Sequence, residues 1–143
     1  MRIRLIVRGR IGRDPEGDIV ERYLKRLPWD CSVTELPDRG GAGLPPREGH
    51  ARTILLDERG ETLDSPAFAQ RIGRWRDEGV RELRFGIGAA DGFTPEERGQ
   101  ADMLLSLGRM TWPHMLARAM LAEQLWRASA ILSGHPYHRA GQD

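Results

Sequence analysis

Short apolar segments alternate along this chain with stretches in which apolar residues recur at helical spacing, and that alternation constrains the fold more than any other feature. Alternating or short continuous apolar runs predict strands at residues 3–7, 32–36, 53–57, 82–87 and 104–107. Helical spacing predicts helices over residues 15–27, 65–79 and 113–132, with a further helix starting after Thr94. Strands that alternate with helices form mainly parallel sheets, so we expect the α/β class, with residues 1–143 as one domain.

Local signals predict where several of these elements begin and end. Ser65 before Pro66 is typical of an N-cap followed by the first helical residue. Thr94, with Glu97 three residues later, has the pattern of a capping box. We expect the strand over 53–57 to end at residues 58–60, and the glycine- and proline-rich residues 37–50 to form a loop. Gly134 is expected to close the last helix.

Composition excludes several classes of protein. The formal net charge is +1, from 22 basic and 21 acidic residues, and no apolar run approaches the roughly 20 residues that span a bilayer. Residues 1–10 are rich in arginine and lack the apolar core of a signal peptide, and the single cysteine, Cys31, has no partner for an internal disulfide. We therefore expect a cytoplasmic protein that does not contact a membrane.

The balanced net charge conceals a basic N-terminus. Residues 1–13 contain five arginines and no acidic residue. Guanidinium groups suit phosphate, so the segment is a candidate contact for an anionic partner. We predict that Arg2, Arg4, Arg8 and Arg10 help to hold RNA, and a merely solvated strand face is the alternative.

The long helix over residues 113–132 is apolar on two faces. One stripe consists of Ala117, Leu121, Leu125, Ala128 and Leu132, and the other of Met115, Ala119, Ala122 and Trp126. A helix with two apolar faces is buried on two sides, and a domain of this length has a small interior. We therefore predict a homodimer in which a second subunit covers one side; deep burial within one subunit is the alternative.

A glycine-rich segment at residues 86–92 (GIGAADG) follows the predicted strand over 82–87 but fits neither common phosphate-binding motif. Its third glycine comes one residue too late for a dinucleotide fingerprint, and no lysine follows it as in a phosphate-binding loop. It remains a place where a ligand can approach the backbone closely, or simply a tight turn. The four histidines and Cys31 lack metal-site spacing, so we expect no metal.

The last residues of the chain group chemically active side chains that chain ends usually lack. Residues 135–139 (HPYHR) bring two imidazoles, a phenol and a guanidinium into five positions. Histidine exchanges protons near neutral pH and arginine binds phosphate, so this tail is a candidate functional segment. Simple packing of Tyr137 is the alternative.

Six segments occur in an order and spacing typical of one protein family. They are residues 54–60 (ILLDERG), 87–92 (IGAADG), 105–108 (LSLG), 111–114 (TWPH), 122–128 (AEQLWRA) and 135–139 (HPYHR). With these segments the chain resembles the small bacterial SPOUT-class methyltransferases that modify N3 of a pseudouridine in large-subunit (23S) ribosomal RNA, the RlmH (YbeA) family. Residues 1–27 also resemble the opening strand and helix of that family.

The resemblance implies an α/β fold with a C-terminal trefoil knot, a homodimer, and S-adenosylmethionine as the methyl donor. It implies ribosomal RNA, within the assembled ribosome, as the substrate. Carried over position by position, the donor site consists of Leu56, Gly88, Leu107, Gly108, Arg109, Met110, Thr111 and Trp112. Two departures from the family pattern are Ala89, where a second adjacent glycine is usual, and the lack of a helix within residues 37–50.

Methyl transfer to an imide nitrogen requires alignment of donor and acceptor and removal of a proton. The tail supplies the catalytic candidates: His138 as the base, Arg139 as a contact to phosphate or to an anionic ring, and Tyr137. Glu123 and Arg127 are further candidates, but their i, i+4 spacing is equally explained by a mutual ion pair. A SPOUT paralogue acting on another RNA, such as transfer RNA, and a non-catalytic ribosome-associated dimer are the alternative functions.

Overall fold

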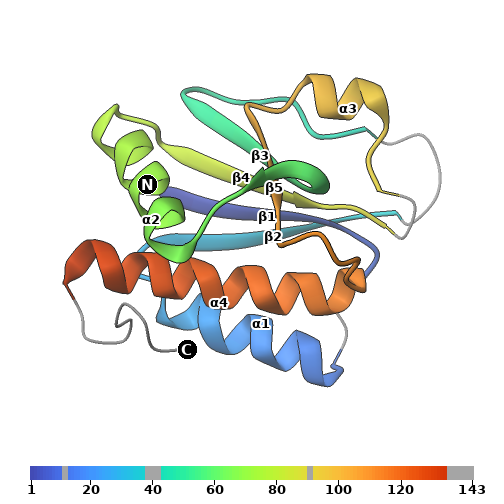
Figure 1. The fold of residues 1–143 in the computed structure, drawn as a ribbon, viewed down its shortest axis with the longest axis horizontal. Helices are drawn as coiled ribbons and strands as arrows, with labels where there is room; N and C mark the ends of the chain where they lie inside the picture. Colours follow the sequence, from blue (N-terminus) through green and yellow to red (C-terminus); the bar gives the residue numbers. More distant parts are fainter. Residues whose placement is uncertain (11–12, 38–42, 90–91, 135–143) are drawn as a thin grey trace.

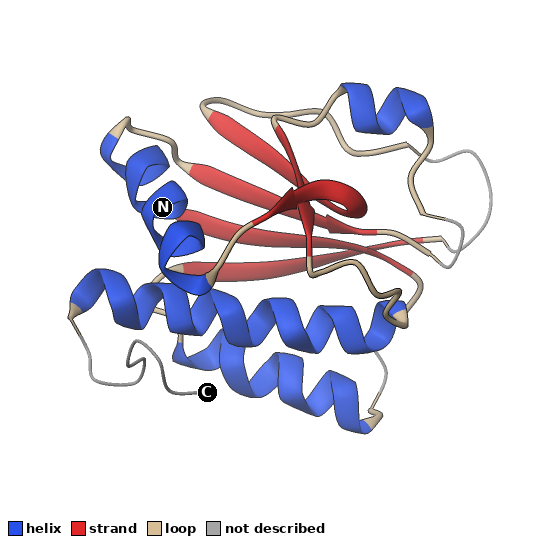
Figure 2. Ribbon diagram, viewed as in Figure 1, coloured by secondary structure: helices blue, strands red, loops and turns tan. Residues whose placement is uncertain are grey.

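The fold is an alternation of strands and helices, as the apolar pattern predicts (Figures 1 and 2). The computed structural model describes residues 1–10, 13–37, 43–89 and 92–134. Its elements are, in chain order, β1 (Arg2–Arg8), α1 (Pro15–Arg26), β2 (Asp30–Leu36), β3 (Ala51–Thr62), α2 (Ser65–Asp77), β4 (Glu82–Ile87), α3 (Pro95–Gly99), β5 (Met103–Ser106) and α4 (His114–Ser133).

All five strands form one sheet in the order β2-β1-β4-β3-β5, and every neighbouring pair is parallel. The expected α/β class is therefore confirmed. In a parallel sheet the carboxyl ends of the strands lie at one edge, and loops from strands far apart in the sequence meet there. This arrangement brings the segments after β3, β4 and β5 together.

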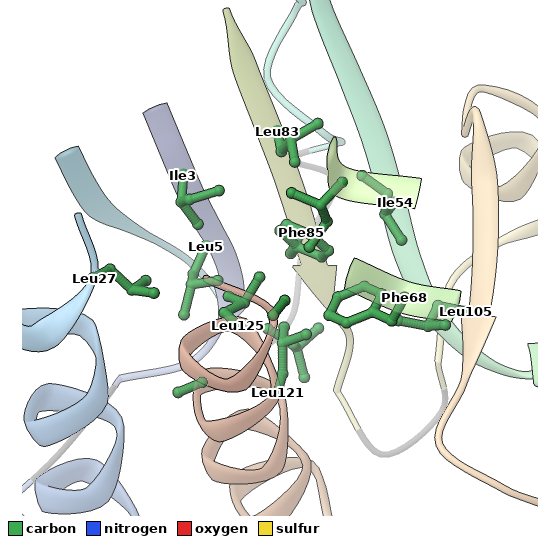
Figure 3. Close-up of a cluster of buried hydrophobic side chains, with 14 of the residues drawn as sticks. Ile3, Leu5, Leu27, Ile54, Phe68, Leu83, Phe85, Leu105, Leu121 and Leu125 are labelled. Carbon is green, nitrogen blue, oxygen red and sulfur yellow. The ribbon is translucent and has the colours of Figure 1, made fainter. Parts of the chain in front are cut away.

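One face of the sheet packs on helices. Figure 1 shows α4 lying beneath the sheet with α1 beside it, and both α1 and α2 contact α4. The alternate residues Ile3 and Leu5 of β1 point to this face, where Phe85 of β4 and Leu121 and Leu125 of α4 complete the core (Figure 3). This burial of alternating strand residues against a helix is what the sequence pattern predicts.

Helix α4 is covered on both of its apolar faces within one subunit. Most residues of both stripes are buried, with Leu121, Ala122 and Leu125 fully inaccessible. The helices α1 and α2 and the sheet supply this cover. The two-faced apolar pattern is thus explained by burial within the chain, which was the alternative interpretation, and it no longer argues for a second subunit.

Strand β3 does not end at residues 58–60, so that expectation is wrong. It continues to Thr62, and its pairing with β5 shifts between Leu56 and Glu61, because both of these residues are register partners of Leu105. The chain therefore leaves β5 after Leu56, folds around it and returns to it at Glu61, as the curl at the end of β3 in Figure 1 shows. Such wrapping of one strand around another suits the knotted topology typical of the family, whereas local sequence signals at 58–60 resemble an ordinary strand end.

The other face of the sheet is covered by loops instead of long helices. Arg84 of β4 is buried there and donates from Nη1 to the carbonyl oxygen of Pro45 at 2.7 Å. Arg47 of the same loop forms an ion pair with Asp102, with 2.9 Å between Nη1 and Oδ2, and this contact holds the loop in place. The described part of the glycine- and proline-rich segment, residues 43–50, thus takes over cover that the family pattern assigns to a helix.

The ends of the helices follow the local signals closely. The capping box of Thr94 and Glu97 is present, and Gly134 ends α4 in the left-handed conformation. The N-cap of α2 is Asp64, one residue before the predicted Ser65, because the Asp64 carboxylate accepts from the amide of Ala67. Within the described residues, no helix is long and apolar enough to cross a membrane.

Candidate functional site

A pocket of about 210 Å³ opens where β3, β4 and β5 end. Its walls are formed by the second half of β3, by the ends of β4 and β5 and by the loops that follow these two strands, and the first turn of α4 closes one side. This is the place where open parallel α/β sheets bind ligands, since several loops converge there and backbone groups are unpaired. The pocket therefore becomes the first candidate for a functional site.

The glycine-rich segment after β4 forms one wall by folding back on itself. A Cβ atom at Gly88 would lie 3.2 Å from the carbonyl carbon of Gly92, so the two glycines are close neighbours. The amide of Gly92, whose φ is 74°, donates to the carbonyl oxygen of Ala89 at 2.9 Å. Ala89 itself has a negative φ, so the methyl group at this departure from the family pattern costs no backbone strain.

The loop over residues 107–112 forms the opposite wall and is fixed by Ser106, the last residue of β5. The buried Ser106 hydroxyl donates to the carbonyl oxygen of Gly108 at 2.7 Å and accepts from its amide at 3.1 Å. Gly108 has a φ of 117°, which favours glycine strongly. Two further contacts hold the loop: Trp112 Nε1 donates to the carbonyl oxygen of Leu107, and the Thr111 hydroxyl donates to Glu58.

The pocket combines an apolar interior with charged groups at its edge. Leu56, Ile87 and Leu107 supply apolar surface, and the exposed Met110 and Trp112 extend it outward. Asp57 and Glu58 add carboxylates, while Arg98 adds a guanidinium that donates to the carbonyl oxygen of Phe93 at 2.6 Å. A zwitterionic ligand with an apolar or aromatic part matches such a lining.

Seven of the eight residues predicted for a donor site line this pocket: Leu56, Gly88, Leu107, Gly108, Met110, Thr111 and Trp112. The eighth, Arg109, is exposed and does not line it. The catalytic candidates Tyr137, His138 and Arg139 lie outside the described residues.

Several lining residues were missed by the sequence reasoning. They include Asp57, Glu58, Ile87, Phe93, Arg98, His114 and Ala117. Their positions were the only available signal: Asp57 and Glu58 follow the predicted strand over 53–57 or end it, Ile87 ends β4, Phe93 and Arg98 come after the glycine-rich segment, and His114 and Ala117 lie in the first turn of α4. Which of these residues face the pocket depends on how the loops meet in space.

Other polar candidates have ordinary structural partners. Arg127 Nη2 lies 2.7 Å from Glu123 Oε1, so these residues form the i, i+4 ion pair that was one of their two interpretations. Burial, followed by the nearby Asp30 carboxylate, raises the pKa of Cys31 to about 11, which disfavours a reactive thiolate. Among the described residues, no group of three potential metal ligands occurs.

The N-terminal arginines differ in their surroundings. Arg8 forms a nearly buried ion pair with Glu97, at 2.7 Å between Nη2 and Oε2. Arg4 donates from Nε to the hydroxyl of Thr34 at 2.9 Å. Arg2 and Arg10 are exposed, so of the four arginines predicted to hold RNA these two are the most available.

A second, larger groove of about 880 Å³ lies beside the pocket. It runs between α1, the residues before α2, and α4, and its lining is mainly apolar, with Ile19, Tyr23, Leu116 and Met120 among its residues. Leu116 is 37% exposed, although it belongs to an otherwise well-packed helix. The groove therefore offers apolar surface that neighbouring elements of the described chain leave open.

The parallel sheet and its pocket define an α/β protein with a small-ligand site at the carboxyl ends of three strands. A family model described as "Predicted SPOUT methyltransferase" matches residues 1–138. The chain belongs to the SPOUT methyltransferase family.

Relatives of this chain carry a more specific name. The chain is 65% identical over 142 residues to "Ribosomal RNA large subunit methyltransferase H" of Zymomonas mobilis subsp. mobilis, covering 99% of this chain and 100% of the relative. It is 60% identical to the protein of the same name from Rhizorhabdus wittichii, again over 99% of this chain and 100% of the relative. A relative with this name from Cereibacter sphaeroides is 46% identical over 97% of this chain and 99% of its own length.

Proposed function

We propose that this protein is an S-adenosylmethionine-dependent methyltransferase that methylates N3 of a pseudouridine in 23S ribosomal RNA, on the assembled ribosome. The proposal treats residues 1–143 as one domain of a cytoplasmic protein. The observation that carries it is the convergence on one pocket of seven residues that the family resemblance assigned to the donor site, from Leu56 to Trp112. The names of full-length relatives at 60–65% identity supply the ribosomal RNA substrate.

The residues of the pocket fit the proposed methyl donor. Gly88 and Gly108 let a ligand approach the backbone, and Leu56, Leu107 and Trp112 offer apolar contacts for a nucleoside. The donor's methionine part carries an ammonium and a carboxylate, which match the carboxylates of Asp57 and Glu58 and the guanidinium of Arg98. When bound, the donor supplies a sulfonium methyl group that a nucleophilic nitrogen can displace in line.

The tail is proposed to supply the remaining groups for catalysis. An imide nitrogen must lose its proton to become a good nucleophile, and His138 is the proposed base that accepts this proton. Arg139 would stabilise the resulting anionic ring or bind a phosphate of the RNA, and Tyr137 would contact the base. In a homodimer this segment could meet the pocket of the partner, which would make the active site composite.

The apolar groove around Leu116 is the surface proposed for that homodimer. Exposed apolar surface of this kind favours a protein contact over solvent. Since both apolar faces of α4 are covered within the chain, the groove and the exposed Leu116 now carry the expectation of a dimer. The ribosomal RNA is expected to contact exposed basic residues of the N-terminal segment.

A binding experiment tests the cofactor assignment directly. S-adenosylmethionine should bind the purified protein in calorimetry, and Gly88→Val should abolish binding without unfolding the protein, because its branched side chain would press on Gly92. Gly43→Ala is the control, since nothing lies within 4 Å of its added Cβ. Unchanged affinity in Gly88→Val would show that the donor binds elsewhere, and no binding by the unaltered protein would favour a non-catalytic dimer.

Substrate identity is tested by comparing RNAs. The protein should methylate 70S ribosomes that lack the modification, and should leave transfer RNA and protein-free 23S RNA nearly untouched. Truncation before residue 135 should abolish methyl transfer and leave donor binding intact. Methylation of transfer RNA in preference to ribosomes would instead identify a paralogue, and full activity of the truncated protein would remove the tail from the mechanism.

A further inference from the structure

Buried charged side chains connect the two walls of the pocket through the end of β1. Arg8, the last residue of β1, donates to Glu97 of α3, and the two side chains are only 12% and 9% exposed. Arg118 of α4, itself 2% exposed, donates from Nη2 to the carbonyl oxygen of Arg8 at 2.6 Å and from Nη1 to that of Arg10 at 3.1 Å. Helices α3 and α4 are thereby tied to the same strand end.

The α3 side of this connection fixes the exit of the glycine-rich segment. Glu97 accepts from the backbone amide of Thr94 through its other oxygen, Oε1, at 3.0 Å. Its neighbour Arg98 donates to the carbonyl oxygen of Phe93 at 2.6 Å, and both Phe93 and Arg98 line the pocket. Phe93 and Thr94 directly follow the glycine-rich segment, and they are therefore held by two consecutive side chains of α3, Arg98 and Glu97.

Helix α3 is too short to hold this position on its own. It has only five residues, and isolated helices of that length are unstable because nucleation is unfavourable. Its Glu97 is anchored by a charge-assisted hydrogen bond in a nearly buried setting, where such bonds are short and strong. The ion pair with Arg8 therefore fixes the position of α3 relative to β1, which the short helix could not do on its own.

The α4 side fixes the opposite wall in the same way. Helix α4 starts directly after the loop over residues 107–112, and His114 and Ala117 in its first turn line the pocket. Arg118 follows Ala117 and donates to the carbonyl oxygens of Arg8, the last residue of β1, and of Arg10, two residues beyond it. Both walls are thus positioned relative to one residue, Arg8, which lies outside the pocket lining.

We infer that Arg8 and Glu97 are positioning residues for the methyl donor: their ion pair holds the glycine-rich wall in the arrangement that closes the pocket against the loop before α4. This inference rests on the proposed binding of S-adenosylmethionine in the pocket. It assigns Arg8 to the cofactor site, in place of the RNA contact that its position in the basic N-terminus suggested. Neither residue is expected to touch the donor.

Calorimetry with S-adenosylmethionine tests the inference, using variants that separate positioning from stability. Arg8→Met removes the guanidinium, and Glu97→Gln removes the charge but keeps an amide oxygen for the capping box. The double variant leaves no buried charge unpaired, so its fold should be more stable than that of either single variant. Each of the three should raise the Kd about tenfold or more, within the range typical of coupling between linked sites.

A structural effect alone would give a different result. Reversible partial unfolding raises the apparent Kd only by the reciprocal of the folded fraction, which circular dichroism measures in the absence of donor. A tenfold rise of the Kd in a variant that is almost fully folded therefore reports positioning, and both the folded fraction and the Kd are measured for every variant. Arg2→Met is the matched control, because Arg2 lies on the same face of β1, pairs with Glu82 at 3.8 Å, and is 61% exposed. It should change neither quantity, and Arg8→Lys, which keeps a charge for Glu97, should recover part of the affinity.

An unaltered Kd in the folded double variant would overturn the inference. A weakened Kd of similar size in Arg2→Met would also overturn it, since the effect would then follow from removal of charge at any position on β1. These outcomes are distinct from failure of the proposed function, which would appear as absent donor binding by the unaltered protein or as normal binding by Gly88→Val.

Discussion

Gly60 of β3 lies directly against the backbone of Leu104 in β5, and a Cβ atom at Gly60 would come within 2.5 Å of the Leu104 carbonyl oxygen. No flexible side chain could yield to relieve this contact, because the nearest atoms all belong to the main chain. The close approach exists because β3 folds around β5 between Leu56 and Glu61. Wrapping of the two strands therefore depends on the absence of a side chain at residue 60.

Gly60→Ala should destabilise the protein because the added methyl group forces the two strands apart. We expect the free energy of unfolding to fall by about 3 kcal/mol, the upper part of the usual range for overpacking. Chemical denaturation measures this change. Gly99→Ala is the control, since its Cβ meets nothing within 4 Å, and it should alter stability by less than about 1 kcal/mol. Equal stability of the two variants would contradict the wrapped arrangement of β3 and β5.

Ser106→Ala should weaken donor binding while leaving most of the stability intact. The variant loses both hydrogen bonds to Gly108, each with a net contribution of about 1 kcal/mol, and the loop over 107–112 loses its anchor. We expect the Kd for S-adenosylmethionine to rise about tenfold, the equivalent of about 1.4 kcal/mol. Ser133→Ala, at the exposed end of α4, should bind normally, and a normal Kd in Ser106→Ala would show that this loop does not need the serine.

The ion pair of Glu97 should make stability depend on pH in the acidic range. Burial alone raises the pKa of Glu97, but hydrogen bonds from Thr94 and from Arg8, together with the charge of Arg8, outweigh it and lower the pKa overall. A carboxylate with a lowered pKa stabilises the folded state above its unfolded pKa of about 4.3, and this contribution is lost as pH falls through the folded value.

The unfolding free energies of the unaltered protein and Glu97→Gln should therefore differ most near pH 6, approach each other as the pH falls below the unfolded pKa of about 4.3, and converge below the folded pKa. Urea denaturation at several pH values gives this difference. Glu21→Gln serves as the control because its ion pair with Lys25 is exposed, and such pairs contribute little. A difference that stays constant down to pH 3 would show that the Glu97 charge does not stabilise the fold.

Neutralising the exposed arginines Arg2 and Arg10 should weaken RNA binding. For each arginine that binds a phosphate, neutralisation should reduce the slope of log affinity against log salt concentration by about 1, because fewer counterions are released. Arg74→Gln with Arg76→Gln removes the same charge from α2 and should leave the slope unchanged. Equal effects of the two double variants would mean that only net charge matters, and that the N-terminal arginines belong to the solvated surface.

Two glutamate substitutions on α4 should separate assembly from folding. Leu116 is partly exposed in the apolar groove, so Leu116→Glu should produce a folded monomer if a second copy covers that surface. Leu125 is fully buried within the subunit, so Leu125→Glu should unfold the chain, because an unpaired charge in a core is costly. Light scattering and circular dichroism distinguish these results, and a monomeric unaltered protein would exclude the homodimer.

Local secondary structure could be predicted from the sequence wherever contacts among a few neighbouring residues decide it. The alternation of Ile3 and Leu5 with polar residues predicts β1, and Thr94 with Glu97 predicts the start of α3. Both depend on contacts within a short segment. The family resemblance likewise predicted seven residues of one pocket, and a parallel sheet brings the ends of its strands and the loops beside them together at one edge.

The sequence by itself thus determined the parallel α/β class, most boundaries of its elements and the position of the pocket. Only the tertiary structure decided which residues act across it: that β3 wraps around β5, that both faces of α4 are covered within one chain, and that Arg8 pairs with Glu97 instead of facing solvent. The physical reason is distance along the chain. Periodicity and capping act over a few residues, whereas Arg8 and Glu97 are 89 positions apart, and their contact exists only because the sheet places the end of β1 beside α3.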